Sequence, residues 1–251
     1  MSAELVEYLL RLGDDRLVLG HRLSEWCGHA PILEEDLALA NLALDSIGQA
    51  SAFLALAGEL EGAGRDADAL AFLRGPTEFR NCLLVEQPNG DFACTIARQL
   101  FFSLAAEHAL AQLSRSAEPR LAALAASAAK ETRYHLRHAR EWWRRLAGGT
   151  EESRRRLVRA LEELWPFTAE LVTPDALDRA LCRAGVAADL DATRAHFERE
   201  LAALFAESGL ARPAQPAVPA PSGRRGAHGE HLDHLLCEMQ SVARAHPGAT
   251  W

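Results

Sequence analysis

The sequence predicts an all-α protein organised around four long helices. Apolar residues recur at helical spacing along nearly the whole chain, and strict alternation of apolar and polar residues never lasts beyond a few positions. The chain has 251 residues, of which 49% are hydrophobic and 25% charged. A chain of this length buries a sizeable core without disulfides or structural metals, so a metal would serve chemistry.

The first two helices follow each other closely. Leucines lie on one stripe from about Glu4 to Cys27, and Gly28 stops this helix. Pro31 suits the first position of the second helix, whose first turn is acidic, as the helix dipole favours. We expect this second helix to continue to about Leu60.

The third and fourth long helices follow an irregular stretch over residues 65–90. Asp91 can cap a helix that runs to about Ser114, and Pro119 opens a helix that ends at Gly148. Long helices joined mostly by short turns pack antiparallel as a bundle, and the longer stretch permits a crossover connection.

The chain is expected to form a single domain over residues 1–251. The bundle core occupies 4–148, and shorter helices over 150–209 form an appendage. The proline-rich segment 211–226 has the composition of an extended connector, and an amphipathic helix over 228–245 follows it.

Charge and composition exclude several partners. Lys and Arg number 27 against 35 Asp and Glu, and the net charge of −8 repels nucleic acid phosphates. The N-terminus lacks the features of a signal peptide, and no uninterrupted apolar run approaches the roughly 18 residues of a membrane span. The five cysteines are widely spaced, which is typical of free thiols in a reducing compartment. We expect a cytoplasmic protein that binds neither nucleic acid nor membrane.

The candidate functional residues are polar side chains on otherwise apolar helix stripes. Asp45 lies on the stripe of the second helix and Glu107 on that of the third. Glu131, His135 and His138 occupy consecutive turns of the fourth. A buried carboxylate costs several kcal/mol unless it is paired or binds a metal, so these acids require compensation.

A di-iron site is one possible compensation, and the sequence falls short of it. Such sites need a Glu from each of two helices and a Glu-x-x-His from each of the other two. Asp45 is followed at the third position by Gly48, and Glu131 is followed by Tyr134. His135 follows Glu131 at the fourth position, which does not reproduce the required spacing.

A buried polar network is the other possibility. In this interpretation Asp45, Glu107 and Glu131 are matched by His135 together with Lys130 or Arg133. Tyr134 is counted with this buried network. Two further polar clusters are interpreted as surface. The first helix carries a line of Glu7, Asp14, His21 and Glu25. The terminal helix carries His228, His231 and His234, which drift around the helix and have no Cys at zinc-ligand spacing.

Several segments resemble a known protein family. They are Leu10–Ala50, Leu83–Gln99, Ala128–Ala139, Leu164–Leu171 and Gly223–Gln240, with the motifs EWCGHAP, VEQPNGDFA and KExxYHLRH. They resemble the PaaA/PaaC family, and within it the C-type subunits of the ring-1,2-phenylacetyl-CoA epoxidase. That enzyme is a bacterial multicomponent monooxygenase of phenylacetate degradation. The similarity covers nearly the whole chain.

The resemblance implies a ferritin-like fold and a structural subunit that has lost its metal site. In this family the A subunit holds the di-iron centre and binds the CoA thioester, and a small B subunit bridges assemblies. A reductase that uses NADPH, FAD and an iron–sulfur cluster supplies electrons. The resemblance therefore places no cofactor in this chain. The resemblance places carboxylates at three metal-ligand positions of the family, which are Asp45, Glu107 and Glu131. At two positions where histidines are needed, this chain has Gly48 and Tyr134.

Two functions remain open at this stage. The chain is either a scaffold that pairs with the A subunit, with a homodimer possible for the chain alone, or a di-iron oxygenase in its own right. The candidate contact loop is Gln87, Pro88, Asn89 and Gly90, because these residues fix a turn and recognition concentrates in loops. The alternative is that this turn only connects two helices.

Overall fold

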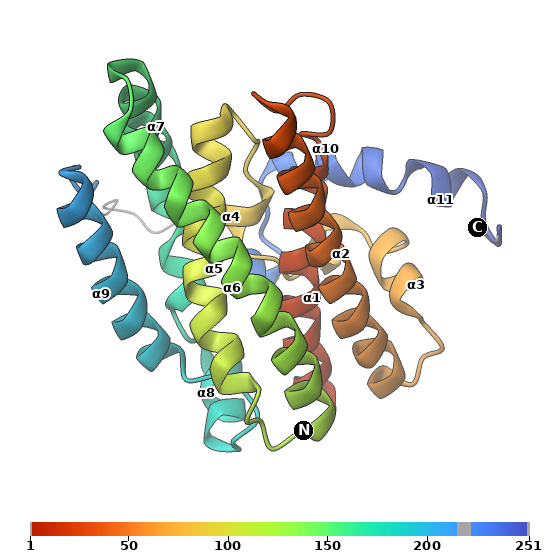
Figure 1. The fold of residues 1–251 in the computed structure, drawn as a ribbon. Coiled ribbons are helices and arrows are strands. Elements are labelled where there is room, and N and C mark those ends of the chain that lie inside the picture. The colour runs from red at the N-terminus through yellow and green to blue at the C-terminus, as the bar shows by residue number, and fades with distance from the viewer. Residues whose placement is uncertain (1, 215–221, 250–251) are drawn as a thin grey trace. The chain divides into compact units, whose positions relative to one another are not determined.

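The computed structural model describes residues 2–214 and 222–249, and within these ranges all regular structure is helical (Figure 1). The all-α prediction is confirmed. The four long helices are α1 (Ser2–Ser24), α2 (Leu33–Glu61), α5 (Phe92–Leu113) and α6 (Pro119–Gly148). Most of the predicted proline-rich connector, residues 215–221, lies outside the described residues.

Shorter helices occupy the rest of the described chain. Between α2 and α5 lie α3 (Ala67–Phe72), η1 (Pro76–Glu78) and α4 (Leu83–Glu86). After α6 come α7 (Glu151–Leu164), η2 (Trp165–Phe167), η3 (Ala169–Val172), α8 (Ala176–Arg183) and α9 (Leu190–Ser208). The last described elements are η4 (Gly223–Arg225), α10 (Glu230–Met239) and α11 (Ser241–Ala245). The predicted terminal helix is thus two helices, with a turn at Gln240.

The turn between α1 and α2 is longer than predicted. The first helix ends at Ser24 rather than Cys27, and Pro31 lies outside the second helix. The Asp36 carboxylate explains the difference, because it accepts a hydrogen bond from the Gly28 N–H at 2.7 Å and fixes the turn. At α5 the predicted cap is present, since the Asp91 side chain accepts from the Cys94 N–H.

The chain divides into two compact units. Unit 1 comprises Met1–Pro88 and Pro221–Trp251, and unit 2 comprises Asn89–Ala220. Unit 1 is therefore built from both ends of the chain, whereas unit 2 is continuous. The single domain expected over 1–251 stays a prediction.

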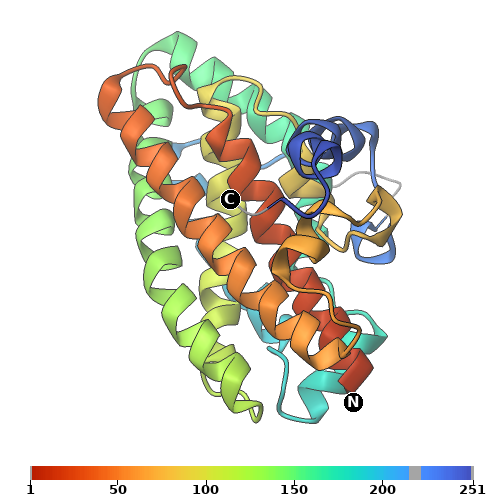
Figure 2. The same cartoon turned by 90° about the vertical axis from the view of Figure 1, so that its right-hand side faces the viewer.

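In unit 1, α1 and α2 run side by side in both ribbon views (Figures 1 and 2). Glycines on α1 permit this close packing. A Cβ at Gly13 would lie 2.7 Å from a Leu54 side-chain carbon, and one at Gly20 would lie 2.8 Å from a carbon of Ile47. Against α1 and α4 packs α10, with its leucines buried.

In unit 2, α5 packs against α6, α7 and α9 around an aromatic core. Trp143 of α6 and Phe205 of α9 meet edge to face at 5.5 Å, and Trp165 contacts Phe205 and Phe101 at 5.9 Å each. Edge-to-face pairs add about 0.5–1.5 kcal/mol beyond their buried area. The helices predicted as an appendage therefore share their core with two of the four long helices.

The composition of α2 sets it apart from the other described helices. It is long and apolar enough by composition to cross a membrane, with a mean hydropathy of 1.3 over its most apolar window. A core helix of a water-soluble protein has the same composition, and 44% of that window is buried.

Two glycines of α2 give a matched stability test. A Cβ at Gly58 would lie 2.0 Å from the Arg65 carbonyl oxygen, whereas one at Gly48 would meet nothing within 4 Å. We expect Gly48→Ala to raise the free energy of unfolding by about 1 kcal/mol, because Ala is the better helix former. Gly58→Ala should lower it by roughly 2 kcal/mol through backbone displacement. Chemical denaturation measures both, and effects of the same sign would contradict this packing of α2.

Candidate functional site

The buried face of α6 differs from the predicted stripe. The predicted stripe includes Glu131 and His138, which are half-buried. The buried residues are instead Leu121, Ala125, Ala128, Ala129, Thr132, His135, Leu136, Ala139, Trp143 and Ala147. Of the predicted network residues on this helix, His135 is therefore buried and Glu131 lies at the edge of the buried face.

Tyr134 does not belong to a buried network. Its side chain is 44% exposed, and the Arg137 guanidinium lies 5.3 Å from the centre of its ring. Successive helix residues are about 100° apart, so Tyr134 turns outward where His135 turns inward. The prediction of a buried Tyr134 is wrong for this reason.

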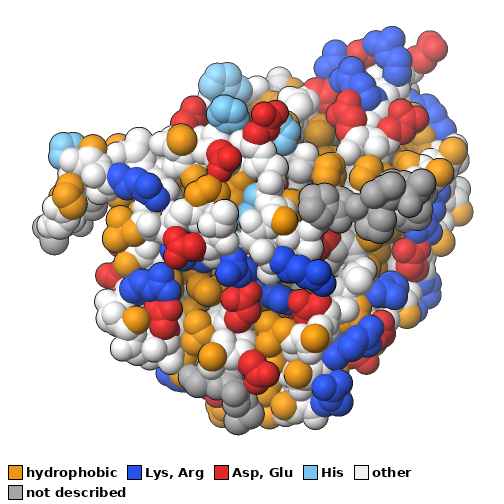
Figure 3. Space-filling model, turned by 180° about the vertical axis from the view of Figure 1, so that it is seen from behind, with side chains coloured by type: hydrophobic (Ala, Val, Ile, Leu, Met, Phe, Trp, Pro, Cys, Tyr) orange, Lys and Arg blue, Asp and Glu red, His pale blue; other side chains and the backbone are white. Residues whose placement is uncertain are grey.

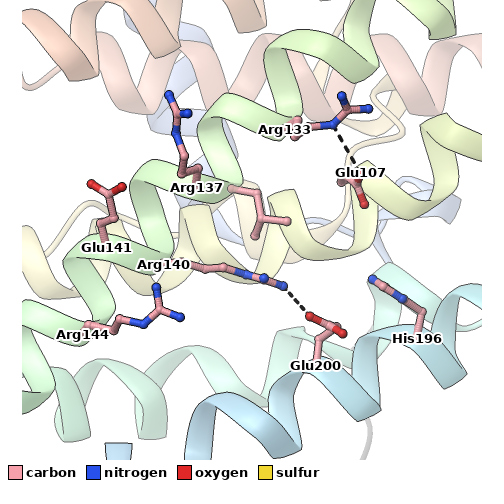
Figure 4. A pocket seen from close by; sticks show the side chains of 9 residues that line it. Glu107, Arg133, Arg137, Arg140, Glu141, Arg144, His196 and Glu200 are labelled. Carbon is pink, nitrogen blue, oxygen red and sulfur yellow. Dashed lines mark hydrogen bonds and ion pairs between the residues drawn. The ribbon is translucent and has the colours of Figure 1, made fainter. Parts of the chain in front are cut away.

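Glu107 of α5 lies in a pocket of unit 2 with a volume of about 420 Å³ (Figure 4). The lining residues are Glu107, Arg133, Leu136, Arg137, Arg140, Glu141, Arg144, His196 and Glu200. The predicted Arg133 partner is present, with its Nε 3.9 Å from a Glu107 carboxylate oxygen. Since Arg133 is largely exposed, solvent screens this pair and it contributes little stability.

Arginines on α6 connect this helix to α9. Arg140 donates to the Glu200 carboxylate at 2.6 Å, as Figure 4 shows, and Arg144 donates to Glu207 at 2.7 Å. These pairs brace two packed helices at the margin of the pocket. The acids on α9 are already matched by guanidinium groups and are not spare ligands.

These residues do not fit a di-iron centre. The guanidinium groups that line the Glu107 pocket repel a divalent cation by Coulomb interaction. Within residues 2–214 and 222–249, no group of three or more His, Cys, Asp or Glu side chains could hold a metal ion. Asp45 is half-buried on α2 in unit 1, and Gly48 supplies no side chain one turn beyond it.

Unit 1 contains a different set of buried charges, which we call the charge cluster: Asp14, Asp15, Arg74, Glu86, Arg224 and His228. Asp14 is fully buried and binds the Arg74 guanidinium through both carboxylate oxygens, one of them at 3.0 Å. The Arg80 N–H also donates to Asp14, at 2.8 Å. Burial raises the pKa of Asp14, and Arg74 opposes that shift. Asp14 was predicted on a solvated face, which is wrong because η1 and its flanking residues cover it.

Asp15 receives its partners from the segment before α4 and from η4. Arg224 donates to its two carboxylate oxygens at 2.9 and 2.7 Å, and the Cys82 N–H donates at 2.7 Å. Arg224 also donates to the Arg80 carbonyl oxygen at 2.9 Å. A bidentate guanidinium–carboxylate pair fixes geometry as well as charge, so this contact positions η4 on α1.

Glu86 and His228 form the third pair of the charge cluster. Glu86 is fully buried and accepts from the Asn81 side chain at 2.9 Å and from the Gly229 N–H at 2.8 Å. The His228 Nδ1 lies 2.7 Å from Glu86 Oε2, and its Nε2 lies 3.0 Å from the Phe79 carbonyl oxygen.

The two neighbours of the His228 ring nitrogens are a carboxylate oxygen of Glu86 and the Phe79 carbonyl oxygen, both of them hydrogen-bond acceptors. Glu86 also accepts from two other donors, so the His228 ring completes the hydrogen bonds of a buried carboxylate. The predicted surface role is wrong for His228, whose side chain is 4% exposed. His231 is half-buried and His234 is exposed.

The candidate contact loop has a local structural role. The Gln87 side chain donates to the Leu83 carbonyl oxygen at 2.8 Å in unit 1. In unit 2, Asn89 Oδ1 accepts from the buried Arg98, and the Asn89 carbonyl accepts from Thr95 at 3.1 Å. Gly90 adopts a φ of +58°, a conformation that favours glycine.

The comparisons with known proteins agree with the resemblance seen in the sequence. The profile of the phenylacetic acid catabolic protein family, PaaA_PaaC, matches residues 1–251. The chain belongs to this family. A relative from Escherichia coli (strain K12), the C subunit of 1,2-phenylacetyl-CoA epoxidase, is 50% identical over 248 residues, which cover 99% of each chain. The ferritin-like fold expected from the resemblance is that of the family.

Three of the five segments that carry the family resemblance meet in the charge cluster. Asp14 and Asp15 belong to Leu10–Ala50, Glu86 belongs to Leu83–Gln99, and Arg224 and His228 belong to Gly223–Gln240. Sequence analysis missed this cluster, although two adjacent aspartates interrupting an apolar helix stripe were a usable signal. The family motifs at these positions thus have a structural explanation.

The Glu86–His228 pair gives a test of the charge cluster. His228→Ala removes a hydrogen-bond partner from a fully buried carboxylate, and we expect it to lower the free energy of unfolding by about 2–4 kcal/mol. Hydrogen exchange of residues 230–239 should rise more than exchange elsewhere. The matched control is His234→Ala, which changes an exposed imidazole of the same helix and should cost less than about 0.5 kcal/mol. Equal effects would contradict the pairing.

A histidine stack in unit 2 predicts a pH dependence. The rings of His108 and His196 stack at 4.4 Å, and burial, with a contribution from His108, lowers the pKa of His196 below 6.5. The folded state disfavours the protonated form of His196. The contribution of His196 to the free energy of unfolding is therefore fully present above pH 6.5 and is lost as the pH falls below that value.

Thermal melting at about pH 7.5 and about pH 5.5 measures this dependence. His196→Gln should reduce the difference between the two melting temperatures, whereas His234→Gln should leave it unchanged. An unchanged difference in His196→Gln would show that other groups carry the dependence.

Proposed function

We propose that this chain is the C subunit of a bacterial 1,2-phenylacetyl-CoA epoxidase and acts in phenylacetate catabolism in the cytoplasm. The observation that carries the proposal is its 50% identity to a relative of that name over 99% of both chains. Because the alignment covers nearly all of both chains, it supports the same role for this chain in the corresponding multicomponent monooxygenase.

Within that enzyme the role of the chain is structural. Arginines line the pocket that contains Glu107, and Tyr134 is exposed to solvent. One turn beyond Asp45, Gly48 has no side chain. These positions therefore do not offer the side chains that a di-iron site needs. Iron, bound by the A subunit, supplies the oxygen chemistry. This chain binds and stabilises the A subunit, while a B subunit bridges assemblies and a reductase with NADPH, FAD and an iron–sulfur cluster delivers electrons.

A scaffold acts through binding energy. A partner that binds only the folded A subunit stabilises it by RT ln(1 + [L]/Kd), about 2.7 kcal/mol at one hundred times the Kd. It also restricts the orientation of the helices that carry the iron ligands. The surface of this chain suits protein contact more than nucleic acid, since acidic and basic side chains are interspersed over the face in Figure 3.

Metal content and complex formation test this function. The chain expressed in iron-rich medium should contain no stoichiometric iron, and it should co-elute with the A subunit in size-exclusion chromatography. The epoxidase activity of the A subunit should require the complex. About two irons per chain, with turnover by the chain alone, would instead establish a di-iron oxygenase.

The loop Gln87–Gly90 is proposed as one contact with the A subunit through the exposed Pro88 and Gly90. Asn89 holds the loop shape from inside unit 2, so Asn89→Ala changes both fold and contact. Gln87→Ala removes one local hydrogen bond and serves as the milder variant. Co-purification with the A subunit should fall in Asn89→Ala more than in Gln87→Ala, and full retention in both would leave the loop a simple connector.

A further inference from the structure

The pocket that contains Glu107 is lined by a row of arginines on one face of α6 (Figure 4). They recur in steps of four, three and four, which keeps them on one side of the helix, and they are Arg133, Arg137, Arg140 and Arg144. The volume of about 420 Å³ lies within the roughly 300–1,000 Å³ that is typical of small-molecule sites. The pocket therefore has both the size and the polarity of a site for a small charged molecule.

The acids that line the pocket do not neutralise this row. Arg140 donates to Glu200 at 2.6 Å, and Arg133 lies 3.9 Å from Glu107. The third acid, Glu141, is exposed. Two of the three acids are thus already paired with guanidinium groups, and the lining arginines outnumber the lining acids.

Arg137 is the lining arginine that lacks an acidic partner. Within residues 2–214 and 222–249 it forms no ion pair, and its guanidinium lies 5.3 Å from the centre of the Tyr134 ring. A guanidinium held over an aromatic face keeps its N–H donors in the plane of the group. Arg137 can therefore donate several hydrogen bonds to a ligand.

Arg140 contributes a second donor. One of its terminal nitrogens binds Glu200, but its Nε is buried and has no hydrogen-bond partner in the described part of the chain. A buried N–H without an acceptor is costly, and such groups are rare in folded proteins. A ligand oxygen at this position would remove that cost.

His196 of α9 contributes a third donor from the other side of the pocket. Its Nδ1 lies 3.0 Å from an Arg199 nitrogen, and because arginine only donates, Nδ1 is the acceptor. Burial, with a contribution from His108, lowers the pKa of His196 below 6.5, so the ring is neutral at pH 7 and its proton is on Nε2. In Figure 4 the ring points toward Arg140 and Glu200.

These donors favour a phosphate group over a carboxylate. A carboxylate has two oxygens in one plane, whereas a phosphate monoester has three terminal oxygens in a tetrahedral arrangement and can accept from donors on both α6 and α9. The pocket is also larger than a phosphate group alone requires, and the buried Leu136 gives it an apolar wall. An organic group attached to the phosphate would contact this wall.

We propose that this pocket, which is bounded by α5, α6 and α9 of unit 2, binds a small organic phosphate monoester. Arg137 and the Nε of Arg140 bind the phosphate oxygens from α6, and His196 donates from α9. The organic group contacts Leu136. This site goes beyond the proposed function, because it requires neither iron nor another subunit.

Isothermal titration calorimetry of the full chain in a phosphate-free buffer tests the proposal, with phenyl phosphate as the probe. We expect one site per chain with a Kd of about 1 mM or below. Arg137→Gln should weaken binding at least roughly tenfold, because it removes a charged donor. The matched control is Arg145→Gln, which changes an exposed arginine of α6 that does not line the pocket and should weaken binding less than about twofold.

A second variant tests the donor on α9. His196→Phe keeps an aromatic ring beside His108 but has no N–H, and we expect it to weaken binding roughly fivefold to tenfold. Circular dichroism and thermal melting check that each variant is folded before it is titrated. Equal affinity of His196→Phe and the unmodified chain would contradict the part assigned to this histidine.

The other outcomes also contradict the proposal. If phenyl phosphate does not bind, or if Arg137→Gln binds it as tightly as the unmodified chain, the pocket is not a phosphate site. If Arg145→Gln weakens binding as much as Arg137→Gln, the attraction is a general effect of positive charge. If inorganic phosphate binds as tightly as phenyl phosphate, the pocket does not recognise an organic group. If benzoate binds equally well, the ligand is a carboxylate.

Discussion

The charge cluster of unit 1 is the constraint on which the rest of that unit depends. Asp14, Asp15 and Glu86 are carboxylates removed from water, and each is costly without a partner. Their partners come from the segment before α4 and from the end of the chain, so the cluster is complete only when α1, α4 and η4 are all in place. Apolar packing alone is compatible with several arrangements of these segments. The charge pairs form in only one of them and so select it.

The sequence predicted the helices well because their signals are local. Asp91 caps α5 and Pro119 opens α6, and both act within one turn of the chain. Helix faces were less predictable. The first half of α6 is rich in alanine on every side, so a stripe shifted by one residue fits the pattern equally well. The partners of Asp14 and Asp15 lie 60 and 209 residues away, and local periodicity carries no information about such distant pairs.

Two carboxylates of unit 2 brace helices rather than bind a metal. In unit 2, Glu107 and Glu200 face arginines of α6, so carboxylates that could bind a cation neutralise guanidinium groups instead. Exposed pairs of this kind add little stability, but they exclude a second cation by charge. The chain is also 50% identical, over 99% of both chains, to a C subunit of the epoxidase. Together these observations support a protein that acts by binding other subunits.

The discontinuity of unit 1 has a consequence for the order of events during synthesis. Residues 89–214 emerge from the ribosome as a continuous unit and can fold while the chain is still growing. Unit 1 has to wait, because Arg224 and His228 are translated after the whole of unit 2. Domains usually fold in the order of synthesis, and here the N-terminal segment is completed last. A chain that stops before Arg224 lacks the partners that Arg224 and His228 give to Asp15 and Glu86, so unit 1 is complete only after both residues have been made.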